Sequence, residues 1–115
     1  SFAPAYAAAK SGLLNLTRVV AKDLGPHNIN VNAICPGLLW TDFWYRLAPL
    51  MANTNPVFEG LSPRELFEKM VAQNTLLKRE QTPEDVGNLV VFLCSEAARN
   101  ISGQSINVDG GMCMR

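Results

Sequence analysis

A tyrosine and a lysine stand four residues apart near the start of this 115-residue sequence, in the stretch "AYAAAKSG" from Ala5 to Gly12. Residues at this spacing occupy one face of a helix, so Tyr6 and Lys10 are expected to be neighbours. A tyrosine phenol ionises near pH ~10 in water, and an ammonium group within a few ångströms stabilises the phenolate. The pair is therefore a candidate general acid/base unit. Chance pairs on solvated helix faces have the same spacing, and that alternative stays open for the pair alone.

Composition argues against several other kinds of chemistry. Ten basic residues balance ten acidic ones without a basic run, which argues against binding to nucleic acid or to an anionic membrane surface. The cysteines Cys35, Cys94 and Cys113 are far apart and His27 is the only histidine, so zinc-ligand spacing is absent. No signal peptide is recognised, and no apolar run approaches the roughly 20 residues of a membrane span. We expect a metal-free cytoplasmic protein with reduced thiols.

The elements that would position the tyrosine–lysine pair follow from hydrophobic spacing and from turn residues. Residues 5–24 are predicted to form a helix, because apolar residues recur at three- and four-residue steps and alanine and leucine dominate. Gly25 is expected to take the left-handed conformation that ends this helix, and Pro26 cannot continue it. The short β-branched runs over residues 29–34 and 105–108 are predicted strands.

Residues 41–82 form a long connection that is predicted to be irregular except for one helix. The stretch "SPRE" at residues 62–65 has the serine, proline and glutamate of a capping box. Connections of this length usually act as lids or binding loops. A further helix is predicted from Thr82 to about Ser95, with two carboxylates in its first turn, where the helix dipole favours them.

The order helix, strand, lid, helix, strand is that of an α/β protein with one right-handed βαβ crossover. Two parallel strands leave a long sheet edge unpaired, and parallel sheets normally have several strands covered by helices. The sequence is therefore interpreted as the trailing half of a larger doubly wound parallel sheet, here with two strands and about four helices. We expect the isolated chain to be poorly stable or self-associated.

The motifs occur in an order that resembles the short-chain dehydrogenase/reductase family over essentially the whole sequence. The tyrosine–lysine helix is followed by "VN" at residues 31–32, then by "PGLLWT" at residues 36–41, then by "SGQ" and "NVDGG" near the end. Each motif is weak alone, but their joint order is specific. The resemblance implies the C-terminal portion of a family member. It also implies a partial Rossmann-like NAD(P)-binding domain over residues 1–115 and a substrate-binding lid over residues 41–82.

The resemblance implies an oxidoreductase that interconverts a small-molecule alcohol and a carbonyl with NAD or NADP. Tyr6 matches the family's catalytic tyrosine, which passes a proton to or from the substrate oxygen. Lys10 matches the lysine that contacts the nicotinamide ribose and favours ionisation of that tyrosine. The implied cofactor-binding residues are Tyr6, Lys10, Pro36, Gly37, Leu38, Leu39 and Thr41.

Alternatives stay open for some of these positions. Pro36 and Gly37 also suit a simple strand-ending turn, and Thr41 also suits a helix cap. Trp40, Phe43 and Trp44 are candidate substrate-binding residues at the start of the lid. Lid aromatics also pack lids onto their cores, because they bury large apolar areas, and we expect packing to account for most of them.

Other parts of the family's site have no counterpart in this sequence. The glycine-rich cofactor turn, the catalytic serine, the asparagine of the proton relay and the residue that selects NAD or NADP all belong upstream of Tyr6. We therefore expect that this chain alone lacks the full cofactor site. The family usually assembles as homodimers or homotetramers, so a homo-oligomer is expected. The alternative is a non-catalytic fragment that acts only through oligomer or protein contacts.

Overall fold

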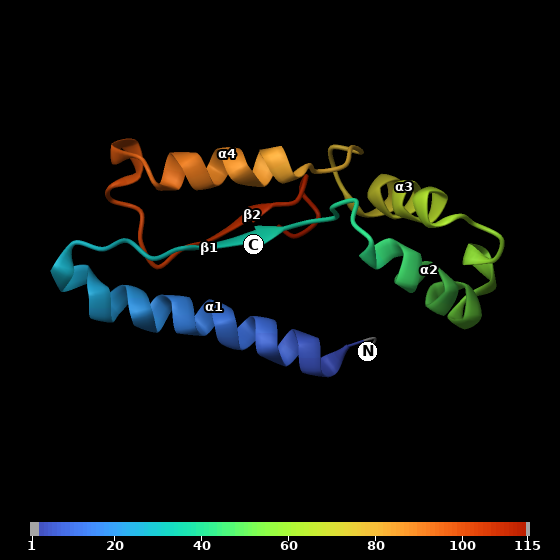
Figure 1. Cartoon of the computed structure of the whole chain (residues 1–115), viewed down its shortest axis with the longest axis horizontal. Coiled ribbons are helices and arrows are strands. Elements are labelled where there is room, and N and C mark those ends of the chain that lie inside the picture. Colours follow the sequence, from blue (N-terminus) through green and yellow to red (C-terminus); the bar gives the residue numbers. More distant parts are fainter. Residues whose placement is uncertain (1–2, 115) are drawn as a thin grey trace. The chain divides into compact units, whose positions relative to one another are not determined.

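The structure, a computed structural model, describes residues 3–114 of the chain. Its helices and strands follow in the order α1 (Pro4–Leu24), β1 (Ala33–Pro36), α2 (Phe43–Thr54), α3 (Pro63–Asn74), α4 (Pro83–Leu93) and β2 (Ser105–Val108) (Figure 1). Short 3-10 turns are η1 (Gly25–His27), η2 (Pro56–Phe58) and η3 (Glu96–Ala98). The α-helices and the strand pair within the described residues confirm the α/β fold class expected from the sequence.

The chain divides into two compact units, and each is built from two separate segments of the sequence. The first, here called the sheet unit, comprises Ser1–Cys35 and Gly87–Asn107. The second, here called the lid unit, comprises Pro36–Val86 and Val108–Arg115. The lid predicted over residues 41–82 therefore falls within the second unit, together with the end of the chain.

Strands β1 and β2 are neighbours in a two-stranded sheet (Figure 1). The Ala33 N–H group donates to the Gln104 carbonyl at 2.8 Å, and the Gly37 N–H group donates to the Val108 carbonyl at 2.9 Å. Residue numbers rise together along both strands in these pairs, so the strands run parallel. β2 has the bounds predicted from the sequence, which confirms that short strand.

Strand β1 shares only residues 33 and 34 with the strand predicted over residues 29–34 and extends to Pro36, so the prediction is wrong for residues 29–32. Over the first part of that segment, asparagine side chains bond to the facing backbone in place of the hydrogen bonds of a strand pair. The Asn30 amide donates to the Arg99 carbonyl at 2.8 Å, and the Asn32 amide donates to the Ile101 carbonyl at 2.8 Å. Short polar side chains that bond to nearby backbone compete with regular pairing, so the strand begins after them.

Helix α1 confirms the predicted helix over residues 5–24, with one correction at its end. The helix begins at Pro4, whose fixed φ angle suits a first turn. Gly25 has φ −53° and continues into the 3-10 turn η1, so the predicted left-handed cap at Gly25 is wrong. The left-handed residue is Asn28, with φ 59°, which closes that turn. Asparagine is one of the few residues other than glycine that adopt this conformation readily.

Helix α3 has the capping box that the sequence predicts. The Glu65 N–H group donates to the Ser62 hydroxyl at 3.1 Å, and the Ser62 N–H group donates to the Glu65 carboxylate at 2.8 Å. The hydrogen bonds from Ser62 hold the pKa of Glu65 below its usual range, because they stabilise the carboxylate. The helix therefore starts at Pro63, with its first donors satisfied.

Helix α2 corrects the expectation that residues 41–82 are irregular except for one helix. Its buried residues are Trp44 and Ala48, which lie four residues apart on one face. Pro49 lies inside the helix, and a proline in a helix interior weighs against a helical prediction. The helical spacing of residues 44, 48 and 51 is the signal that would have indicated this element.

The core of the lid unit is an aromatic cluster between α2 and α3. Phe67 is 0% exposed and Leu66 is 1% exposed, and both come from α3. The ring of Trp44 packs edge-on against Phe67 at a centroid distance of 5.0 Å. Val71 and Ala48 complete the buried set. This cluster gives the lid an apolar core of its own, so its helices are held by packing and not by helix propensity alone.

The sheet unit leaves much apolar surface uncovered within the described residues. α1 and the part of α4 in this unit lie on opposite sides of the two strands (Figure 1). Their exposed apolar side chains are Leu13, Leu16, Val19, Val90, Val91 and Phe92. Parallel sheets are normally covered on both faces, so this unit has apolar faces that its own described residues do not bury. Among residues 3–114, no helix combines the length and the apolarity needed to cross a bilayer.

Replacing Phe67 by alanine is expected to destabilise the lid unit by about 3–5 kcal/mol, because truncating a fully buried ring leaves a cavity. Both tryptophans lie in the lid unit, so urea unfolding followed by tryptophan fluorescence measures this change. The matched control is Phe43→Ala, since Phe43 is 56% exposed and its loss should change stability by less than about 0.5 kcal/mol. Equal effects of the two substitutions would contradict the assigned core.

Candidate active site

Tyr6 and Lys10 lie together in the first turns of α1, as their spacing predicts. The Lys10 ammonium nitrogen lies 5.6 Å from the centroid of the Tyr6 ring, within the range of a cation–π contact. Tyr6 is 64% exposed and Lys10 is exposed as well. The helix thus fixes a phenol and a cation side by side and leaves both available to a ligand. Alanines at residues 7–9 keep the surface between them small.

The segment that follows β1 turns at Gly37, and the chain approaches this glycine closely from two directions. A Cβ atom at Gly37 would lie 2.6 Å from the Gln81 side-chain oxygen and 2.7 Å from the Asp109 Cα atom. Real Cβ atoms are not found so close to other heavy atoms, so only glycine fits without movement. The turn after β1 therefore requires its glycine for packing, in addition to any contact with a ligand.

Gln81 connects this turn to the segment before α4. Its side-chain oxygen accepts a hydrogen bond from the Leu38 N–H group at 3.1 Å, and its side-chain nitrogen donates to the Arg79 carbonyl at 2.9 Å. Residues Leu39 and Gln81 also form a parallel β-bridge. Gln81 is only 6% exposed, so its amide is a buried polar group whose oxygen and nitrogen each have a partner.

The "DGG" motif after β2 closes the other side of the same turn. The Asp109 carboxylate accepts hydrogen bonds from the Gly111 N–H group at 2.9 Å and from the Cys113 N–H group at 2.8 Å. The Gly110 carbonyl accepts from the N–H groups of Leu76 and Leu77. Three segments that are distant in sequence are therefore joined by backbone hydrogen bonds around one buried amide.

Leu39 and Thr41, two of the predicted cofactor-binding residues, lie between this turn and α2. The Leu39 carbonyl accepts a hydrogen bond from the Trp44 indole N–H group at 2.8 Å. Helix α2 starts at Phe43, and Asp42 occupies its N-cap position. Thr41 is exposed and its carbonyl accepts from the Trp44 N–H group at 3.1 Å. The alternative prediction of Thr41 as a helix cap is therefore wrong by one residue, because Asp42 occupies the N-cap position.

The three predicted substrate-binding residues of the lid lie in different environments. Trp44 is 4% exposed and belongs to the lid core. Trp40 is half-buried, with its ring 5.4 Å from the Phe67 ring and 5.7 Å from the Tyr45 ring. Phe43 is exposed. Trp44 therefore packs inside the lid, whereas Phe43 and part of Trp40 remain open to a ligand.

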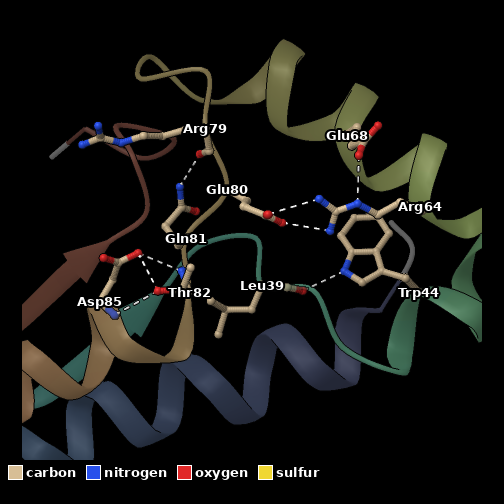
Figure 2. A network of polar contacts seen from close by, with 9 residues as sticks. All are labelled: Leu39, Trp44, Arg64, Glu68, Arg79, Glu80, Gln81, Thr82 and Asp85. Atoms are coloured by element: carbon tan, nitrogen blue, oxygen red, sulfur yellow. Dashed lines mark hydrogen bonds and ion pairs between the residues drawn. The ribbon is translucent and has the colours of Figure 1, made fainter.

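An arginine joins the lid core to the segment that carries Gln81. The Arg64 guanidinium lies 5.2 Å from the Trp40 ring centroid and 5.1 Å from the Phe67 ring centroid. It donates two hydrogen bonds to the Glu80 carboxylate, at 3.0 and 3.1 Å, and one to Glu68 at 2.9 Å (Figure 2). The hydrogen bonds to Glu80 are the largest cause of a raised pKa at Arg64, and the bond to Glu68 adds to it, because both carboxylates stabilise the charged guanidinium. A fork-to-fork contact of this kind fixes direction as well as distance.

The predicted site residues thus fall into two groups. Tyr6 and Lys10 belong to the sheet unit, and the residues of the "PGLLWT" stretch belong to the lid unit. Gln81, which holds that stretch from outside it, is not among the predicted site residues, and Asp109 was noted only as part of the "NVDGG" motif. Gly37 and the pair Gly110 and Gly111 were the available signal, because glycines at two separate turns can indicate close approach of segments. Within residues 3–114, no group of histidine, cysteine and carboxylate side chains could hold a metal ion.

Comparison with known proteins gives one consistent family. The family profile described as "Enoyl-(Acyl carrier protein) reductase" matches residues 1–113. A short-chain dehydrogenase/reductase from Armillaria gallica is 39% identical over 108 residues, which are 94% of this chain and 38% of that protein. A diacetyl reductase of the (S)-acetoin-forming type from Staphylococcus epidermidis is 38% identical over 110 residues, which are 96% of this chain and 41% of that protein.

Solved structures give the same result. L-sorbose reductase from Gluconobacter frateurii, in complex with NADPH and L-sorbose, matches with a TM-score of 0.81 and 32% identity, covering 97% of this chain and 41% of that one. A 4-hydroxyisoleucine dehydrogenase in complex with NADH matches with a TM-score of 0.69 and 28% identity, covering 93% of this chain and 37% of that one. The chain spans about two fifths of the length of these proteins. The matches confirm the resemblance drawn from the motifs.

Replacing Gly37 by alanine is expected to destabilise the protein by about 1–3 kcal/mol, because the added methyl group meets the Gln81 amide and the Asp109 backbone. The matched control is Gly87→Ala in helix α4, where the structure leaves open space around the added methyl group. That control should stabilise by about 0.5–1 kcal/mol. Urea unfolding followed by circular dichroism measures both changes. A neutral or stabilising Gly37→Ala would contradict the close approach described above.

Proposed function

Because the chain belongs to the short-chain dehydrogenase/reductase family, we propose that it supplies the tyrosine–lysine part of an oxidoreductase that uses NAD or NADP. The reaction interconverts a small-molecule alcohol and a carbonyl compound. The observation that carries this proposal is the exposed phenol of Tyr6 beside the Lys10 ammonium on one helix face. Relatives named as reductases of diacetyl and of L-sorbose are consistent with this class of substrate.

Tyr6 is proposed as the general acid/base. In carbonyl reduction its hydroxyl gives a proton to the substrate oxygen, and in alcohol oxidation its phenolate accepts that proton. The exposure of the ring in α1 lets the hydroxyl reach a substrate atom from solvent. A positioned proton donor of this kind typically contributes 10²–10⁴-fold to a rate.

Lys10 is proposed to act through its charge and its reach. An ammonium beside a phenol favours the phenolate and therefore assists proton release. Lysine also has three donor hydrogens, which suit the hydroxyl groups of a ribose. Its position one helical turn after Tyr6 lets one rigid element hold both groups, so the two do not need separate ordering when a ligand binds.

The residues present fit a nicotinamide dinucleotide, which supplies or accepts hydride when bound. Tyr6 and Lys10 offer exposed donors for a ribose. The turn at Pro36–Leu39 follows the carboxyl end of β1, which is where α/β sheets bind ligands. The Leu39 carbonyl uses one lone pair for Trp44 and keeps a second for a carboxamide N–H group. Pro36, Gly37, Leu38 and Thr41 are proposed to contact the same cofactor.

Part of the lid surface is proposed to contact the substrate. Phe43 is exposed and Trp40 is half-buried, so both offer apolar area to a small molecule. The assignment of Trp44 also stays a prediction, although its burial means that it would act through the lid core. The cytoplasmic location and the homodimer or homotetramer likewise stay predictions.

The second candidate function is a non-catalytic one, through oligomer or protein contacts. Exposed apolar side chains on α1 and α4 favour it, since such faces commonly bind other protein surfaces. On this alternative even a protein that carries this chain together with the upstream half of the sheet binds no dinucleotide, whereas the oxidoreductase proposed above does. The two functions therefore differ in dinucleotide binding, which can be measured directly.

Tyr6→Phe is expected to lower kcat for reduction of a ketone such as diacetyl or L-sorbose by roughly 10²–10⁴-fold in the protein that carries this chain. The substitution removes only the hydroxyl group, so the fold should persist. Tyr45→Phe is the matched control, because Tyr45 is the other tyrosine and is similarly exposed, at 60% against 64%. Oxidation of NADPH or NADH, followed by absorbance, measures the rate. Near wild-type turnover of a folded Tyr6→Phe protein would refute the proposed role of Tyr6.

Titration of the 115-residue chain with NADH and NADPH is expected to give no micromolar binding, because the phosphate-binding part of the family's site has no counterpart here. Isothermal calorimetry measures the affinity, with a protein that contains the upstream half of the sheet as the positive control. Micromolar binding by the chain alone would contradict the expectation of an incomplete site. Absence of binding in both proteins would favour the non-catalytic function.

A further inference from the structure

The structure assigns Gln81 as a positioning residue that fixes the turn at Gly37–Leu39. The effect of this residue on cofactor binding rests on the proposed function. Gln81 lies outside the motifs that resemble the family. Its side chain nevertheless contacts that turn directly, and its carboxamide is almost completely buried. The turn is the part of the lid unit proposed to receive the nicotinamide.

The first argument is the pair of hydrogen bonds made by the carboxamide. The oxygen accepts from the Leu38 N–H group at 3.1 Å, which is a donor within the turn. The nitrogen donates to the Arg79 carbonyl at 2.9 Å (Figure 2), which fixes which way the amide points. With one end anchored to its own backbone segment, the other end has a defined position. The oxygen therefore sets where the Leu38 N–H group can lie.

The second argument is the space around the carboxamide. A Cβ atom at Gly37 would lie 2.6 Å from the Gln81 oxygen, and one at Gly110 would lie 2.7 Å from the Gln81 nitrogen. Gly110 also has φ +63°, a conformation that other residues rarely adopt. The amide is therefore held between two turns that both lack side chains. Close packing on two sides prevents it from adopting other rotamers.

The third argument is the anchorage of the segment that carries Gln81. The adjacent Glu80 is held by two hydrogen bonds from Arg64, whose guanidinium also stacks on the lid core. On the other side, the Thr82 N–H group donates to the Asp85 carboxylate at 2.8 Å at the start of α4 (Figure 2). Gln81 thus stands between two fixed residues, and the turn takes its position from both helices. A glutamine in an unanchored loop would not have this effect.

The consequence concerns the groups that face the cofactor. Leu39 follows Leu38 directly, and its carbonyl is one of the groups proposed to contact the carboxamide of the nicotinamide. A turn that is held at Leu38 presents the Leu39 carbonyl in one orientation before any ligand arrives. Such preorganisation lowers the entropy lost on binding. Gln81 is accordingly proposed to affect cofactor affinity without touching the cofactor.

The test compares Gln81→Met with Gln81→Glu by amide hydrogen exchange in the ¹⁵N-labelled protein that carries this chain. Methionine keeps the length of the side chain and removes the acceptor, so exchange at Leu38 should rise by roughly 5- to 30-fold. Glutamate keeps an acceptor oxygen for the Leu38 N–H group but loses the amide donor to the Arg79 carbonyl, so it should restore only part of the protection. The Leu66 amide, which donates to the Ser62 carbonyl within the same unit, is the internal reference and should not change.

Two outcomes would overturn the inference. Unchanged exchange at Leu38 in Gln81→Met would mean that the carboxamide does not hold the turn. Equal acceleration at Leu38 and Leu66 would mean that Gln81 only stabilises the lid unit as a whole. Selective acceleration at Leu38, with partial rescue by glutamate, supports it.

Titration with NADPH separates this inference from the proposed function. In the protein that carries this chain, NADPH should shift the amide signals of Leu38 and Leu39, and Gln81→Met should weaken binding by roughly 5- to 30-fold. If NADPH has no effect on the wild-type signals, the proposed function fails. The exchange experiment still decides the role of Gln81 in that case, because it needs no cofactor.

Discussion

The close approach of three chain segments around the Gln81 carboxamide is the constraint on which the lid unit depends. A buried amide must have both its oxygen and its nitrogen hydrogen-bonded, because an unpaired buried polar group is expensive. Here the oxygen is paired within the turn after β1 and the nitrogen within the segment before α4. Gly37 and Gly110 make room for it, since any larger residue would displace the amide from both partners. The start of the lid, its end and the end of the chain are therefore fixed together.

The lid unit is stabilised by apolar packing, and its charged groups orient its segments relative to one another. Phe67 and Leu66 are fully buried, and the Trp44 ring packs against Phe67. Arg64 lies on the surface of this core and pairs with Glu80, although the pair is partly exposed. Exposed ion pairs contribute little to stability, so its main effect is to align α3 with the segment before α4. Trp44 adds a direct bond to the Leu39 carbonyl, which ties α2 to the same turn.

The α1 helix follows a different requirement, which is exposure. A proton donor must reach its substrate, so the role proposed for Tyr6 and Lys10 requires that they are not buried among apolar side chains as Trp44 is. Their neighbours are alanines, which support the helix without covering either group. The sheet unit also leaves apolar side chains of α1 and α4 uncovered by the described residues. Its architecture therefore provides for contacts beyond those that this chain makes with itself.

Local chemistry is what the sequence determined about this protein. The shared face of Tyr6 and Lys10, the capping box of α3 and the strand at residues 105–108 depend on neighbours within a few residues, and all three were predicted. The order of motifs also identified the family, since it records many local features at once. Only the tertiary structure decided where the lid aromatics lie, where β1 begins and what holds the turn at Gly37. The partners of that turn, Gln81 and Asp109, lie more than forty residues further along the chain. Hydrogen bonds and steric contacts at such separations depend on the folded path of the backbone, which spacing along a sequence does not reveal.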